Sequence, residues 1–132
     1  AAGRRVGPRI LAANEGISVP GGHMAGSVAV AAHSIPEALA QLDAAEAQGV
    51  DLIKLMITGG VMDAKKKGVP GEMKMPPEMI KAVCDRAHAA GYRVAAHVES
   101  PQGRVSKSTR PPTVRMVVTP LISSVRAKPQ TI

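Results

Sequence analysis

Residues 50–60 read VDLIKLMITGG, and this stretch predicts the fold of the chain. It is a short apolar run that follows Gly49 and ends in the pair Gly59-Gly60. A run of this length between glycines is typical of a strand that is buried on both faces. Such strands belong to parallel sheets that helices cover, so we expect an α/β protein.

One charged residue, Lys54, lies in the middle of this apolar run. Because side chains alternate along a strand, Lys54 shares one strand face with Leu52 and Met56. An isolated ammonium in a protein interior costs several kcal/mol. Lys54 is therefore expected either to reach solvent or to meet a buried carboxylate. The other possibility is a functional lysine at the carboxyl end of a parallel strand, where α/β proteins build their sites.

The segments on either side of this strand predict helices. Ser34 and Glu37 have the spacing of a capping box, and the helix that they open is expected to run to about residue 48. Pro76-Pro77-Glu78 opens a second helix, whose apolar residues recur at helical spacing until Gly91. Two helices are therefore expected to cover the strand.

Residues 92–98, YRVAAHV, predict the next strand, so the middle of the chain alternates between strand and helix. Such a βαβ unit has parallel strands and a right-handed crossover. Residues 17–19 continue in an extended conformation, and residues 8–13 give a short possible strand. Residues 26–33 allow no firm prediction. We therefore expect about three parallel strands with covering helices.

Lys54 and His97 lie in two strands that are predicted to be neighbours. Because neighbouring strands are about 4.8 Å apart, the two side chains are expected side by side at the same end of the sheet. His23 follows the glycines of a GGH motif, residues 21–23, which marks a tight backbone site. By itself His23 could equally be an ordinary exposed histidine of a loop.

The length of 132 residues fits one domain, and its core must be aliphatic because Tyr92 is the only aromatic residue. The single cysteine, Cys84, excludes an internal disulfide and is expected to pack on the core face of its helix. No apolar run reaches the roughly 18 residues of a membrane span. Residues 1–9 also lack the apolar region of a signal peptide, so a cytoplasmic location is expected.

The net charge of +7 belongs to one end of the chain. Six of the 17 basic residues lie in residues 103–132, which contain no acid, and this leaves 11 basic residues against 10 acidic ones. The six are Arg104, Lys107, Arg110, Arg115, Arg126 and Lys128. Because this segment has no aromatic residue to stack on bases, specific nucleic-acid binding is not expected. Recurring prolines predict an irregular tail over residues 103–132.

Five short motifs follow one another in an order that resembles one protein family. They are GPR at residues 7–9, GGH at 21–23, DLIK at 51–54 with Gly59-Gly60, AHAAG at 87–91 and VAAH at 94–97. Over about residues 7–102 the chain resembles the central part of a metal-dependent amidohydrolase. The similar branch contains imidazolonepropionase-like enzymes and Xaa-Pro dipeptidases. No single motif is specific, but their order and spacing together are.

This resemblance implies that residues 1–102 are part of a (β/α)8 barrel of the TIM type with a metal site at its C-terminal face. In the family, the lysine that matches Lys54 is carboxylated and bridges two zinc ions. The histidine that matches His97 binds the second metal, and the one that matches His23 lies near the substrate. The implied reaction is hydrolysis of an amide or cyclic amide, a small-molecule substrate, by a metal-bound hydroxide. Imidazole and carbamate oxygen are ligands that suit zinc.

The sequence also departs from the family pattern. The His-x-His pair of the first strand would precede Ala1, and no histidine or aspartate follows Gly103 to match those of the sixth and eighth strands. The aspartate is the family's proton shuttle, so no catalytic residue is assigned. A barrel needs roughly 250 residues. We therefore expect a truncated chain that is inactive, or nearly so, by itself.

The change of character after Gly103 has two interpretations. Residues 103–132 fit either a shifted reading frame or join to unrelated sequence, or a disordered basic tail. Two alternatives to a hydrolase also stay open. One is a non-catalytic α/β remnant that needs a partner chain, because open strand edges favour self-association. The other is a module that binds an anionic partner through its basic tail.

Overall fold

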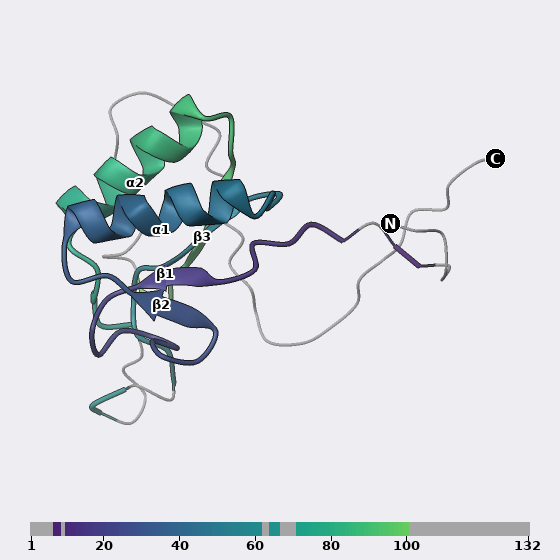
Figure 1. Cartoon of the computed structure of the whole chain (residues 1–132). Helices are drawn as coiled ribbons and strands as arrows, with labels where there is room; N and C mark the ends of the chain where they lie inside the picture. Colours follow the sequence, from purple (N-terminus) through teal and green to yellow (C-terminus); the bar gives the residue numbers. More distant parts are fainter. Residues whose placement is uncertain (1–6, 9, 62–63, 67–70, 101–132) are drawn as a thin grey trace.

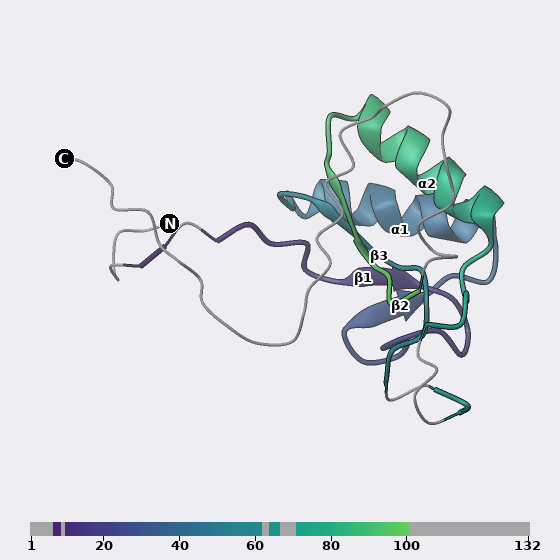
Figure 2. The same ribbon diagram turned by 180° about the vertical axis from the view of Figure 1, so that it is seen from behind.

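The computed structural model describes residues 7–8, 10–61, 64–66 and 71–100. They form two layers, a four-stranded sheet and two helices that lie together over one of its faces (Figure 1). The elements are β1 (Gly16–Ser18), β2 (Ala29–Ala31), α1 (Ile35–Ala47), β3 (Ile53–Met56), α2 (Pro77–Ala89) and β4 (Val94–His97). The strand order is β2-β1-β3-β4, and all neighbouring strands are parallel (Figure 2). The predicted α/β class is confirmed.

The first helix, α1, begins where the sequence predicts it. The Ser34 side chain accepts a hydrogen bond from the Glu37 N–H at 3.4 Å, and the Glu37 carboxylate accepts one from the His33 N–H at 2.9 Å. These bonds satisfy backbone donors at the start of the helix. After Ala47 the chain turns at Gly49, whose φ of 71° lies in the left-handed region that glycine adopts without strain. The cap and the turn thus fix both ends of α1.

The second helix, α2, turns an apolar stripe toward the sheet. The buried residues of this stripe are Met79, Ile80, Val83 and Ala87. Cys84 is half-buried and packs against the core, as predicted. On the outer side, the Arg86 guanidinium donates hydrogen bonds to Asp43 at 2.7 Å and to Glu46 at 2.9 Å. Arg86 therefore joins α2 to α1 at the surface.

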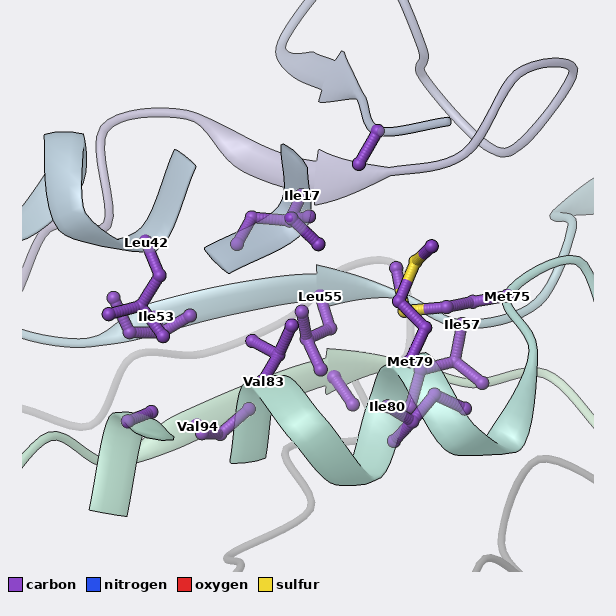
Figure 3. Packing of buried hydrophobic residues seen from close by; sticks show 14 of the residues in the cluster. Ile17, Leu42, Ile53, Leu55, Ile57, Met75, Met79, Ile80, Val83 and Val94 are labelled. Atoms are coloured by element: carbon purple, nitrogen blue, oxygen red, sulfur yellow. The ribbon is translucent and has the colours of Figure 1, made fainter. Parts of the chain in front are cut away.

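The hydrophobic core lies between the two helices and the sheet. Figure 3 shows Leu42 of α1 against Ile53 of β3, and Val83 of α2 beside Leu55. Leu42, Leu55 and Val83 have no exposed surface. Each fully buried aliphatic side chain of this kind contributes about 1.5–3 kcal/mol. The packing therefore holds one face of β3 against the helices and leaves its other face for a site.

Two segments differ from the expectations. Residues 29–31 form β2, so the sheet has four strands and not about three. Residues 10–13 form no strand, because Asp51 takes both backbone groups of Ala12. The Ala12 N–H donates to the Asp51 carboxylate at 2.9 Å, and the Ala12 carbonyl accepts from the Asp51 N–H at 2.8 Å.

Two further expectations concern a membrane span and the tail of the chain. No helix in the described residues is long and apolar enough to cross a membrane. The predicted tail, residues 103–132, and the boundary at residue 102 lie outside the described residues.

Candidate functional site

The sheet face that points away from the helices gathers the residues singled out in the sequence. Lys54 of β3 pairs in register with Ala95 of β4, and Met56 pairs with His97. In a parallel pair, residues in register point to the same side of the sheet. Lys54 and His97 therefore share one face, but they lie one pleat apart along the strands and not directly side by side.

Lys54 is half-buried on this face. Burial lowers the pKa of its ammonium, because a low-dielectric surrounding disfavours the charged form. Among the described residues, no carboxylate forms an ion pair with Lys54. The expected alternative, a buried carboxylate that pairs with Lys54, is therefore not found among the described residues.

His97 is held as a neutral imidazole. Burial is the main cause that lowers its pKa, and the nearby His23 and Lys54 lower it further, whereas Glu99 and a hydrogen bond with the Gly59 backbone raise it. The Nε2 atom of His97 is buried and has no hydrogen-bond partner among the described residues. It lies 3.5 Å from the Glu99 carboxylate, a contact that is an ion pair only when the ring is protonated. A neutral ring with an unused Nε2 is suited to bind a metal.

His23 comes to the same place from the loop after β1. Its ring stacks on the ring of His97, with centroids 4.2 Å apart and planes inclined by 11°. The Ser18 hydroxyl donates a hydrogen bond to the His23 carbonyl at 3.0 Å. A Cβ added to Gly60 would lie 2.6 Å from His23 Cε1, so the ring packs directly against the backbone of Gly60. His23 is thus part of the cluster and not an ordinary loop histidine.

Two residues of this neighbourhood were missed in the sequence, Thr58 and Glu99. Thr58 is fully buried just after β3, and its hydroxyl accepts a hydrogen bond from the Glu99 N–H at 2.9 Å. This bond ties the segment after β4 to the segment after β3. The available signal was that Glu99 lies two residues after His97, at the end of a parallel strand where sites are built.

The described residues supply only part of a metal site. They contain no group of three or more His, Cys, Asp or Glu side chains that could hold a metal ion. Lys54 is not in that class unless it is carboxylated. The unused nitrogen of His97 and the lowered pKa of Lys54 are properties that suit metal ligands. Two such residues are nevertheless too few to complete a metal site.

Comparison with known proteins gives matches in structure only. No protein-family model matches the sequence, and no curated protein matches it. The chain is similar to a Xaa-Pro dipeptidase solved with methionine bound in its active site, with 29% identity and a TM-score of 0.67. It is also similar to a Bifidobacterium longum protein assigned as a prolidase, with 37% identity and a TM-score of 0.64. The A. niger ochratoxinase, at 21% identity and a TM-score of 0.67, shows the same fold.

These matches cover most of the chain but little of the neighbours. The chain is covered to 80% in the first two comparisons and to 76% in the third, whereas it spans 29%, 24% and 28% of the respective neighbours. The chain therefore has the fold of part of an amidohydrolase barrel of the TIM type, and its likeness to a dipeptidase and a prolidase supports a place in the amidohydrolase superfamily of hydrolases.

Proposed function

We propose that this chain provides part of a metal-dependent site that hydrolyses C–N bonds of amides or cyclic amides. Lys54, as a carbamate, and His97, through Nε2, would hold the metal, and zinc suits this ligand set. The observation that carries the proposal is the buried Nε2 of His97. It has no hydrogen-bond partner among the described residues, and it shares a sheet face with the half-buried Lys54.

The lowered pKa of Lys54 bears directly on the carbamate. Only the neutral amine reacts with carbon dioxide: its nitrogen lone pair forms a bond to the carbon, and a proton leaves the nitrogen for water. Burial raises the share of neutral amine at a given pH. The product is an anion, which suits a lysine whose positive charge is costly where it lies.

The other residues of the cluster would position the substrate and exclude water. A bound zinc ion would supply a hydroxide nucleophile at neutral pH. His23, stacked on His97, presents the rest of its ring where a substrate amide would approach. Glu99, fixed through Thr58, places a negative charge at the rim of the same site.

Zinc titration by calorimetry tests the ligand assignment. The 132-residue chain is compared with Lys54→Ala, His97→Ala and a matched control, His33→Ala, which removes an exposed histidine. Even removal of a ligand's hydrogen-bond partner costs on the order of 10–100-fold in metal affinity, so each ligand variant should lose at least that much. Equal affinity in all four proteins would count against both ligands.

Hydrolysis by the chain itself is expected to be absent or very slow. The sequence has four histidines, and His33 and His88 belong to other parts of the fold: an exposed loop position and helix α2. The measurement is turnover of Xaa-Pro dipeptides and lactams with added zinc. Turnover that disappears in His97→Ala would overturn the expected inactivity.

A second candidate is a non-catalytic α/β module that functions with another chain. The observation in its favour is the open sheet, whose outer strands β2 and β4 each have one neighbour among the described residues. Unpaired strand edges favour association with further strands. If the chain binds no zinc but co-purifies in a defined complex, this candidate replaces the hydrolase site.

A further inference from the structure

We propose that Glu99 binds the same metal ion as Lys54 and His97 and is the third protein ligand of the site. The inference rests on the proposed function, because it requires that ion to be bound. Glu99 corresponds to none of the ligands that the family resemblance implies. Three protein ligands and an open position for water are the usual arrangement of a catalytic zinc site.

Glu99 lies on the same side of the chain as His97, two residues further along. Side chains alternate in extended backbone, so residues two apart share a side. Between them, Val98 is 6% exposed and packs in the hydrophobic core. The Glu99 carboxylate therefore points away from the core, and its Oε1 atom lies 3.5 Å from His97 Nε2.

The distance between these two atoms is close to that expected for two ligands of one zinc ion. Zinc binds imidazole nitrogen at about 2.0–2.1 Å and carboxylate oxygen at about 2.0–2.2 Å, and two such ligands of a tetrahedral ion lie about 3.4 Å apart. His97 Nε2 is buried and has no hydrogen-bond partner among the described residues. An ion that binds both atoms would therefore need little movement of either side chain.

A hydrogen bond does not account for this contact while the His97 ring is neutral. A neutral imidazole has one N–H, and the ring uses it in the hydrogen bond with the Gly59 backbone. Nε2 then carries a lone pair that faces a carboxylate oxygen, which is also an acceptor. Two facing acceptors repel each other, and a cation that both of them bind removes the repulsion.

The backbone of Glu99 is held in place from two sides. Its N–H donates a hydrogen bond at 2.9 Å to the hydroxyl of Thr58, a residue that is fully buried. On the other side, a Cβ added to Gly71 would lie 2.7 Å from the Glu99 carbonyl carbon, so the two backbones are in contact. A ligand on a fixed backbone loses less conformational freedom when the metal binds.

The charges of the three ligands also suit a divalent ion. Among the described residues, no lysine or arginine forms an ion pair with Glu99, and its one ion-pair contact is His97. The Lys54 carbamate and the Glu99 carboxylate each carry one negative charge, whereas the His97 ring is neutral. Together they balance the charge of Zn²⁺, and a balanced set of charges is what a partly buried site requires.

Zinc titration by calorimetry, in buffer that contains bicarbonate, tests this inference on the 132-residue chain. Glu99→Gln keeps the shape of the side chain and removes its charge, and it should weaken zinc binding at least about 10–100-fold. Glu15→Gln is the matched control, since it removes an exposed carboxylate just before β1, at the opposite end of the parallel strands, and it should bind zinc like the unmodified chain. Far-UV circular dichroism checks that each variant is folded.

Glu99→His separates a bond to the metal from a mere attraction of charge. Histidine can bind zinc but supplies no negative charge, so this variant should bind zinc more tightly than Glu99→Gln. X-ray absorption spectroscopy of the zinc-loaded proteins should show one more imidazole ligand in Glu99→His than in the unmodified chain. An equal number of imidazole ligands in the two proteins would overturn the inference.

The same titrations separate a failure of this inference from a failure of the proposed function. Zinc binding that weakens in Lys54→Ala and His97→Ala but not in Glu99→Gln would overturn the third ligand alone. Zinc binding that none of these variants changes, or no zinc binding by the unmodified chain, would overturn both proposals.

Discussion

At the residue scale, the chemistry of the site depends on which nitrogen of His97 is available. The Gly59 backbone forms a hydrogen bond with the ring, and Nε2 has no such partner among the described residues, so Gly59 bonds to Nδ1. A bond of Nδ1–H to a backbone carbonyl is a common way to orient a metal-binding histidine and to fix its tautomer. Burial lowers the pKa of the ring, so Nε2 keeps its lone pair at neutral pH.

Gly60→Ala should disturb the stacked pair of histidines. The added Cβ would lie 2.6 Å from His23 Cε1, closer than real contacts allow, so the ring must move off His97. Overpacking of this kind costs about 1–3 kcal/mol. We expect a lower midpoint of urea unfolding and a changed ring-current shift of the His97 Cε1 proton in NMR spectra. Gly7→Ala is the control, since an added Cβ meets no atom there.

Cys84 should react slowly with alkylating reagents. Burial, with a smaller effect of Asp85, raises the pKa of its thiol. At a given pH less thiolate is therefore present than for a free cysteine, whose pKa is about 8.5. Because the folded state keeps the thiol proton to a higher pH, the free energy of unfolding should fall as the pH rises above the pKa of this thiol in the unfolded chain. The alkylation rate should therefore climb at higher pH in the native chain than in the urea-unfolded chain. Identical pH profiles would contradict the burial of this thiol.

The sequence revealed Lys54 because a charge stands out in an apolar run, and it located His97 because the next strand was predicted. It did not reveal Glu99, which looks like an ordinary acidic loop residue until its N–H is found bonded to Thr58. The stacking of His23 on His97 also joins residues that are far apart in the chain. Contacts of this kind depend on the packing of whole elements, which a local pattern does not contain.

At the scale of elements, both helices and β3 were predictable because their signals are local. Ser34, Gly49 and Gly91 mark helix ends, and glycines on both sides mark β3. Strand β2 was not predictable, because AVA is too short to have a period and its conformation is set by pairing with β1. At residues 10–13 a strand was predicted, but none is formed. Asp51 there forms the backbone hydrogen bonds that a strand would need.

Ser34→Ala should destabilise the chain by about 1 kcal/mol, the usual cost of a lost N-cap. The Ser34 hydroxyl accepts a hydrogen bond from the Glu37 N–H at the start of α1, and alanine cannot replace it. Urea unfolding followed by circular dichroism measures the difference in the free energy of unfolding. Ser27→Ala, which removes a loop hydroxyl bonded to the Met24 carbonyl, serves for comparison and should cost less. Equal stability of Ser34→Ala and the unmodified chain would show that the cap contributes nothing.

At the scale of the whole molecule, the chain combines a well-packed core, which lies between the two helices and the sheet, with a sheet that is not closed into a barrel. Its neighbours among solved structures are much longer, since the chain spans 24–29% of them. A barrel closes its sheet, whereas here β2 and β4 are the two outer strands among the described residues. The proposed hydrolase site depends on this geometry, because it uses the face of the sheet away from the helices.

Lys54 and His97 are proposed to hold one metal ion. Anomalous diffraction from crystals of the chain grown with zinc and bicarbonate tests it most directly. We predict a zinc peak about 2.0–2.1 Å from His97 Nε2, with the carbamate oxygen of Lys54 on the same ion. Zinc bound elsewhere, or an unmodified Lys54 beside an empty His97, would contradict the account.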